Sequence, residues 1–141
     1  MKPKAVYEYL PIYGRHIFYG NNVDAIKKLI RKKYKPSIVD SDMLFDGVNC
    51  HGFISTLNCE DDETRVRCYV MFVDDCADIG TVAHEATHLT NRVCLYLGLE
   101  LDALNDEAQA YLTGHFTQVF MEKIRGVKPK QEALKNIKGK K

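Results

Sequence analysis

No apolar run in this sequence approaches the roughly 18 to 20 residues that a membrane-spanning helix requires. The first residues, MKPKAVYEYLPIYGRHIFYG, also lack the continuous apolar segment and the small-residue cleavage site of a secretory signal. The sequence contains no internal repeat, and its only low-complexity stretch is at the C-terminal end. We therefore expect a cytoplasmic protein with no membrane partner.

The cysteines include no C-x-x-C pair, the spacing that is typical of zinc knuckles and of thiol redox sites. The chain has 5 cysteines, an odd number. Cys68 falls in a strand pattern and Cys94 in a helical pattern, where a reduced thiol packs as a small hydrophobic group. Because disulfides are rare in the cytosol, we expect the cysteines to be reduced and mostly structural.

Length and charge predict one domain followed by a basic tail. A chain of 141 residues can form one domain with a hydrophobic core, and it is too short for two comfortable ones. Residues 128–141 carry six lysines and one glutamate, whereas residues 1–127 carry 14 basic and 18 acidic side chains. The tail has no aromatic residues for base stacking, so nucleic acid is not the expected partner. We expect a single domain over 1–127 and a flexible, solvated tail over 128–141.

Hydrophobic periodicity predicts an α+β fold in which a small sheet is followed by two packed helices. Asn21 or Asn22 can cap the first helix, Asp74, Asp75 and Asp78 supply polar side chains for the start of the helix over 79–97, and Gly98 and Gly126 can end the last two helices. Residues 37–50 are loop-rich. We expect one or two strands over 5–19, a helix over 23–34, a hairpin of strands 51–57 and 65–73, and helices over 79–97 and 103–124.

The stretch His84-Glu85-Ala86-Thr87-His88 lies in the middle of the helix expected over 79–97. Residues four apart on a helix are rotated by only about 40° and lie about 6 Å apart along its axis. His84 and His88 can therefore direct their imidazoles at one metal ion. Glu85 lies about 100° around the helix, where it can reach a water on the metal and accept its proton.

A catalytic zinc ion usually has three protein ligands and one open position. The natural source of the third is the start of the next helix, which the turn at Gly98 folds back against the first. That segment reads LNDEAQAYL over residues 104–112 and contains Asp106 and Glu107.

These two motifs, in this order, resemble the gluzincin zinc metallopeptidases. The resemblance implies that His84, His88 and Glu107 bind Zn²⁺ and that Glu85 is the general base. The N-D-E-x-x-A-Y segment is also similar to small zincin-like proteins encoded by bacteriophages. The resemblance covers about residues 79–120, and it implies a minimal zincin-like domain with a hairpin packed on the H-E-x-x-H helix.

Several further residues have more than one interpretation. Asp106 is the alternative third ligand, and Asp106 or Asp102 can orient a ligand histidine. Tyr111 can donate a hydrogen bond to a tetrahedral oxyanion or can simply pack in the core. His115 can line the active-site cleft or be an ordinary, partly exposed histidine. We interpret Cys50 and His51, which open a strand, as structural.

The leading hypothesis is a zinc-dependent hydrolase, namely a narrow-specificity metallopeptidase whose substrate is a peptide or protein. In this mechanism Glu85 accepts a proton from the attacking water and then delivers it to the leaving amine. The strand over 65–73 is expected to be an edge with which an extended peptide can pair. The alternative is a zincin-derived module that binds a phage or host protein and has no peptidase activity.

Overall fold

The computed structural model describes residues 1–34, 50–60 and 65–128. It is an α+β domain, which confirms the predicted fold class. In the described part of the chain, no helix is long and apolar enough to cross a membrane. The elements are β1 (Ala5–Leu10), β2 (Arg15–Gly20), α1 (Val23–Lys33), β3 (Gly52–Glu60), β4 (Arg65–Val73), α3 (Ile79–Tyr96), α4 (Glu107–Val119) and the π-helix η2 (Phe120–Ile124).

The four strands form one mixed sheet in the order β1-β2-β4-β3. The pairs β1–β2 and β3–β4 are antiparallel, whereas β2–β4 is parallel. The prediction that the strand over 65–73 is an edge strand is therefore wrong, because β4 lies between β2 and β3. Its residues 68–73 are buried on both faces of the sheet, a pattern that is typical of an interior strand.

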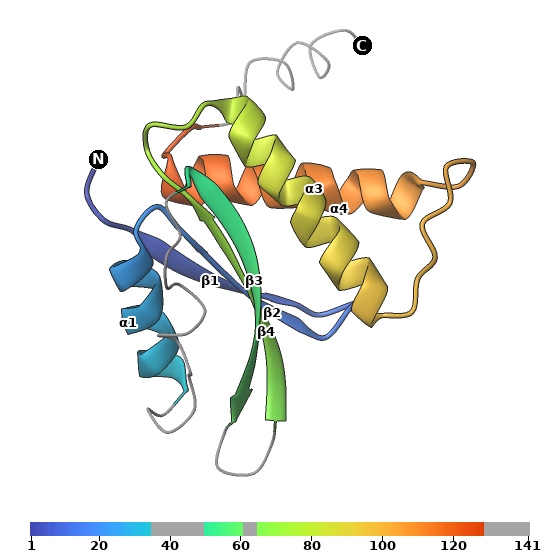
Figure 1. The fold of residues 1–141 in the computed structure, drawn as a ribbon, viewed down its shortest axis with the longest axis horizontal. Helices are drawn as coiled ribbons and strands as arrows, with labels where there is room; N and C mark the ends of the chain where they lie inside the picture. The colour runs from blue at the N-terminus through green and yellow to red at the C-terminus, as the bar shows by residue number, and fades with distance from the viewer. Residues whose placement is uncertain (35–49, 61–64, 129–141) are drawn as a thin grey trace, which may run out of the picture.

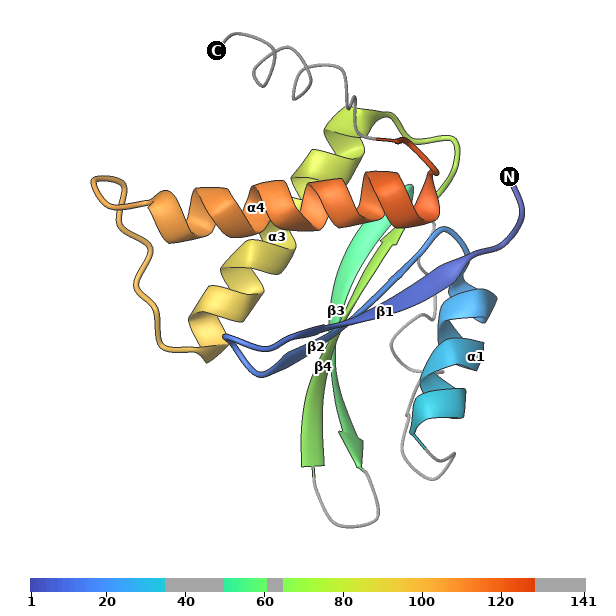
Figure 2. The same cartoon turned by 180° about the vertical axis from the view of Figure 1, so that it is seen from behind.

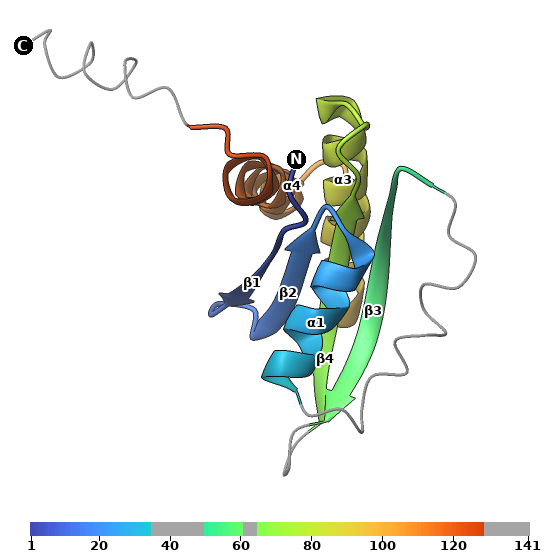
Figure 3. The same ribbon diagram turned by 90° about the vertical axis from the view of Figure 1, so that its left-hand side faces the viewer.

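Helix α1 covers one face of the sheet, and α3 and α4 cover the other (Figures 1 and 3). Because side chains alternate along a strand, β4 contributes to a core on each face. Tyr69 and Met71 pack in the cluster formed with α3 and α4, whereas Val70 and Phe72 pack in the cluster formed with α1. The H-E-x-x-H sequence on α3 therefore lies on a helix that packs against a sheet with a core on each face.

Polar caps and glycines set the ends of the helices, as the sequence predicts. The Asn22 side chain accepts a hydrogen bond from the Ala25 N–H (3.0 Å), and the Asp78 side chain accepts one from the Thr81 N–H (2.9 Å). Helix α3 ends before Gly98, whose φ of 71° favours glycine. Gly126 has a φ of 68° after η2, which confirms the predicted end there.

Two predicted boundaries differ from the structure. Strand β3 continues to Glu60, although residues 58–60 are predicted to be loop, because Cys59 is buried against α1 and pairs with Val66. Helix α4 begins at Glu107 instead of 103. The Asp102 carboxylate accepts a hydrogen bond from the Leu104 N–H (2.9 Å), a local turn that competes with helix.

The structure bears on the prediction about the cysteines but not on those about the loop over 37–50 and the C-terminal tail. The five cysteines form no disulfide in the part of the chain that the structure describes, and Cys68 and Cys94 are buried as expected. The loop predicted over 37–50 lies outside the described residues except for Cys50, and the tail lies outside them beyond residue 128.

Candidate metal centre

The helical spacing brings the imidazoles of His84 and His88 together on the surface of α3. Their Nε2 atoms are 3.0 Å apart, and the ring centroids are 4.6 Å apart with planes at 81°. Both side chains are exposed to solvent. The sequence prediction that the two rings converge on one point is therefore confirmed as geometry.

The donor atoms of this pair fit a shared metal ion. Zinc–nitrogen bonds of about 2.0–2.1 Å at a tetrahedral angle place two ligand nitrogens about 3.3 Å apart. The observed separation of 3.0 Å reaches that value with a small rotation of either ring. Imidazole nitrogens are also ligands that zinc prefers. His84 and His88 are thus suited to hold two of the four positions around the ion.

Glu85 lies beside the pair but turns into the protein. Its side chain is buried, with 8% of its surface exposed. Burial raises the pKa of its carboxyl group, and the nearby His84 and His88 imidazoles only partly oppose this rise. The carboxyl is therefore a stronger base than an exposed glutamate, in a position to exchange a proton with a group bound near the histidines.

A glycine on the edge strand makes room for this carboxyl group. A Cβ atom added to Gly52 would lie 2.9 Å from Glu85 Cγ and 3.2 Å from Glu85 Oε1. Distances this short are tighter than ordinary van der Waals contact, so only glycine lets β3 pass so close. Strand β3 thus forms one wall around the Glu85 side chain.

Glu85 and His84 line an open cleft of about 480 Å³ between the start of β3 and the start of α3. The β3 side contributes Cys50, His51 and Gly52. The α3 side contributes Asp78, Gly80 and Thr81 in addition to the two motif residues. Cys50 and His51, which the sequence predicts to be structural, therefore line the same cleft as His84 and Glu85.

His51 is held in this cleft by a carboxylate. Its Nδ1–H donates to Asp74 Oδ2 at 2.7 Å, and the other oxygen of Asp74 accepts from the N–H groups of Cys76 (3.0 Å) and Ala77 (2.9 Å). Burial opposes ionisation of Asp74, but the hydrogen bonds from His51 and these amides outweigh it and lower the pKa of the carboxyl. The hydrogen bond fixes the tautomer and leaves Nε2 of His51 available. No motif spacing signals this pair, because β3–β4 pairing brings the two residues together.

The structure does not bring Glu107 into a cluster with the histidines. Within the described ranges, no group of three or more His, Cys, Asp and Glu side chains could hold a metal ion. Helices α3 and α4 cross, and both views place the start of α4 away from the start of α3 (Figures 1 and 2). Thr90 and Thr113 meet at this crossing with hydroxyl oxygens 2.8 Å apart.

The start of α4 nevertheless faces the helix that carries the motif. Asp106 lines a hollow together with Thr87 and Asn91 of α3. Successive residues of an α-helix are rotated by about 100° around its axis. Around α3, His84 and His88 therefore lie between Thr87 and Asn91 on one side and Glu85 on the other. Glu107 follows Asp106 directly and is exposed. Its role as third ligand, and the alternative role of Asp106, stay predictions.

Tyr111 and His115 do not line the cleft of His84 and Glu85. Both border a separate, mostly apolar hollow of about 160 Å³ beside the β1–β2 turn. Tyr111 is 75% exposed, so it does not pack in the core. The structure therefore provides no support for catalytic roles of these two residues at the histidine pair.

His115 instead joins α4 to the sheet. Its Nε2–H donates to both carboxylate oxygens of Glu8, at 2.9 Å and 3.1 Å, and the Tyr19 hydroxyl donates to the same carboxylate at 2.8 Å. These contacts satisfy the half-buried carboxylate of Glu8 between β1 and α4. They indicate a structural role for His115.

Comparison with protein-family models, with curated proteins and with solved structures found no significant match. The site must therefore be interpreted from its own geometry. That geometry comprises two adjacent imidazole nitrogens, a buried carboxyl of raised pKa, and a cleft that ends at an edge strand.

Proposed function

We propose that the protein is a zinc-dependent hydrolase, namely a metallopeptidase of narrow specificity. The observation that carries this proposal is the pair of Nε2 atoms 3.0 Å apart beside the buried Glu85 carboxyl. His84 and His88 bind the ion, and Glu85 stays free to transfer protons. Glu107 of α4 completes the ligand set, as the resemblance to gluzincins implies.

When bound, a zinc ion supplies a Lewis acid that polarises a carbonyl group and makes water more acidic. Glu85 accepts a proton from the attacking water at its carboxylate and then delivers that proton to the leaving amine nitrogen. The raised pKa of the Glu85 carboxyl supports both steps, because the group binds a proton more readily than an exposed glutamate does. His51 is oriented by Asp74, and with its Nδ1–H donated to that carboxylate its Nε2 can accept a hydrogen bond from an N–H group or a water in the cleft.

The substrate of this hydrolase is an extended peptide that pairs with β3. In the described part of the sheet β3 has one unpaired edge, and its first residue, Gly52, lies against Glu85. Backbone pairing with an edge strand would hold a peptide extended. A peptide on β3 would then pass directly over the cleft. This edge replaces the strand over 65–73, which the structure places inside the sheet.

The small size of the domain supports a narrow processing role. A single sheet with its covering helices provides no second substrate-binding lobe among the described residues. We place this activity in the cytoplasm, in a phage or prophage setting as the resemblance implies. The partner is a peptide or protein, and nucleic acid is not required.

One observation favours the second candidate, a zincin-derived binding module without peptidase activity. In the part of the chain that the structure describes, no third ligand stands beside His84 and His88. A protein that had lost catalysis could keep the cleft and β3 for binding alone. The buried Glu85 argues for the hydrolase, because a binding surface does not need a general base there.

Metal content and hydrolysis together distinguish these candidates. Purified wild type should contain stoichiometric zinc by elemental analysis, whereas His84→Ala and Glu107→Ala should have lost most of it. Glu85→Gln should retain the metal and lose cleavage of a quenched-fluorescent peptide library. Metal-free wild type from zinc-replete medium would overturn the proposal. Bound zinc without any Glu85-dependent cleavage would favour the binding module.

A further inference from the structure

The N-terminal part of the chain carries a strongly basic surface. Residues 1–34 contain eight basic and two acidic side chains, a formal charge of +6. One of the two acids, Glu8, is already paired with His115 and the Tyr19 hydroxyl. Most of this excess positive charge lies on α1, whose basic residues are Lys27, Lys28, Arg31, Lys32 and Lys33.

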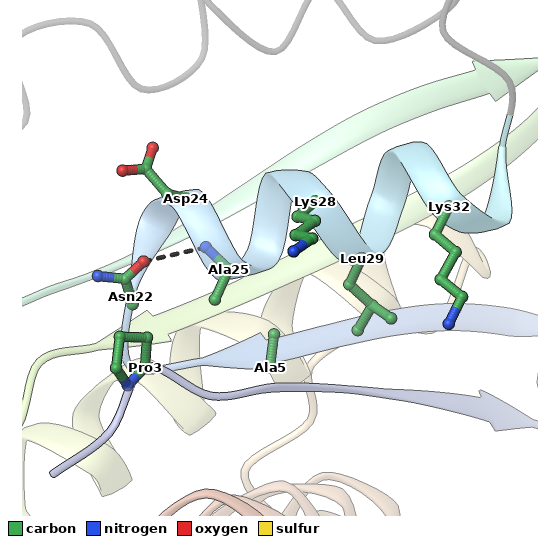
Figure 4. A pocket seen from close by; sticks show the side chains of 8 residues that line it. All are labelled: Pro3, Ala5, Asn22, Asp24, Ala25, Lys28, Leu29 and Lys32. Atoms are coloured by element: carbon green, nitrogen blue, oxygen red, sulfur yellow. Dashed lines mark hydrogen bonds between the residues drawn. The ribbon is translucent and has the colours of Figure 1, made fainter.

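A hollow of about 630 Å³ lies between α1 and the edge strand β1 (Figure 4). Ala5 and Leu29 form part of its apolar lining, and Lys28 and Lys32 stand at its rim. Figure 4 shows Leu29 and Lys32 reaching from α1 toward the strand that carries Ala5, with Lys28 one turn earlier. We call this hollow the α1–β1 groove.

The two lysines of the α1–β1 groove are available for a ligand. Both are exposed, and neither has a hydrogen bond or ion pair with any other residue in the described ranges. Being four residues apart, they lie about 6 Å apart along the helix axis. Two ammonium groups at this spacing form a short positive row beside an apolar surface.

The other wall of the groove is an unpaired strand edge. Both backbone groups of Lys4 point toward β2, because its N–H donates to Asn21 Oδ1 (2.7 Å) and its carbonyl accepts from the Asn21 N–H (3.1 Å). Backbone groups alternate in direction along a strand, so the N–H and C=O of Ala5 point away from β2. In the described sheet no strand pairs with this side of β1.

We propose that the α1–β1 groove binds an extended acidic peptide of a partner protein. The peptide pairs with β1 through the outward backbone groups at Ala5, and its alternate carboxylates contact Lys28 and Lys32. Side chains on one side of a strand recur about every 6.6–6.8 Å, close to the spacing of the two lysines. Leu29 contacts apolar side chains of the same peptide.

The strand edge and the apolar lining of the groove favour a peptide over nucleic acid. Phosphate backbones bind lysines without needing a strand edge or an apolar surface, whereas an acidic peptide can use the two lysines, the edge of β1 and Leu29 together. Because α1 covers the face of the sheet opposite α3, a partner bound here leaves the cleft of Glu85 open (Figure 3).

The test measures binding of a fluorescent peptide that alternates glutamate with valine, using the full-length protein. Binding should weaken as salt rises and should be lost when glutamine replaces glutamate in the peptide. The double variant Lys28→Ala/Lys32→Ala should bind about tenfold more weakly, since it removes two exposed ion pairs with the peptide. The control Arg92→Ala/Lys123→Ala removes the same charge elsewhere and should bind as the wild type does.

Ala5→Pro tests the strand pairing separately from charge. Proline at this position removes only an N–H that points away from β2, so the sheet keeps its hydrogen bonds. The variant should unfold at the wild-type denaturant concentration and bind the peptide at least fivefold more weakly. Unchanged binding by folded Ala5→Pro would overturn the proposal. Binding of oligothymidylate in preference to the peptide, or of neither probe, would also overturn it.

Discussion

The close contact between Gly52 of β3 and Glu85 of the H-E-x-x-H motif yields the most specific prediction, which concerns Gly52→Ala. The new methyl group would lie 2.9 Å from Glu85 Cγ and 3.1 Å from the Phe72 carbonyl oxygen. Overpacking of this kind costs about 1–3 kcal/mol. Alanine also restricts the unfolded chain, which offsets about 0.4–1 kcal/mol of that cost. The net expectation is a loss of about 1–2 kcal/mol in the free energy of unfolding.

A double-mutant cycle isolates the contact between residue 52 and Glu85. It compares urea unfolding of the wild type, Gly52→Ala, Glu85→Ala and the double variant. Truncating Glu85 removes the crowded atoms, so Gly52→Ala should then cost about 1 kcal/mol less than in the wild-type background. Gly114→Ala is the matched control. A Cβ there meets no atom within 4 Å, so it should stabilise α4 by about 0.5–1 kcal/mol.

For the proposed hydrolase, the same substitution separates proton transfer from metal binding. Gly52→Ala pushes the Glu85 carboxyl away from its place in the cleft, whereas the contact does not involve His84 or His88. Hydrolysis should therefore fall while zinc content stays at the wild-type value. A cycle with no coupling between Gly52 and Glu85 would refute the packing argument. Wild-type hydrolysis in the folded variant would refute the role of this carboxyl position.

Two further predictions concern the other polar contacts. Asp74→Asn should lower the free energy of unfolding at neutral pH, because the pKa of Asp74 is lower in the folded state than its ordinary value of 3.8. This contribution to stability is complete at pH values above 3.8, and it is lost as the pH falls through the lowered pKa. Urea unfolding at several pH values should show a smaller difference between Asp74→Asn and wild type in acid, and a constant difference would contradict the His51 contact. His115→Leu should cost about 1 kcal/mol, because the half-buried Glu8 carboxylate loses this partner and keeps the hydrogen bond from the Tyr19 hydroxyl. Zinc content should not change in His115→Leu, and a loss of zinc without a loss of stability would contradict the structural role.

Local patterns of the sequence were sufficient for most elements of this fold. Hydrophobic periodicity and caps act over a few residues, so Asn22, Asp78 and Gly98 mark helix ends correctly. The convergence of His84 and His88 is equally local, because helical geometry alone places residues four apart on one side. The start of α4 was missed, since the Asp102 turn competes with helix formation.

The composition of the site depends on contacts between segments that lie far apart in the chain. The pairing of β3 with β4 brings His51 to Asp74 and places Gly52 against Glu85, and no spacing in the sequence encodes either contact. Strand order is also a tertiary property, because it depends on which strands share apolar faces. The sequence by itself determined the motif and its helix. Only the tertiary structure decided which strand borders the motif, and that His115 supports the sheet through Glu8.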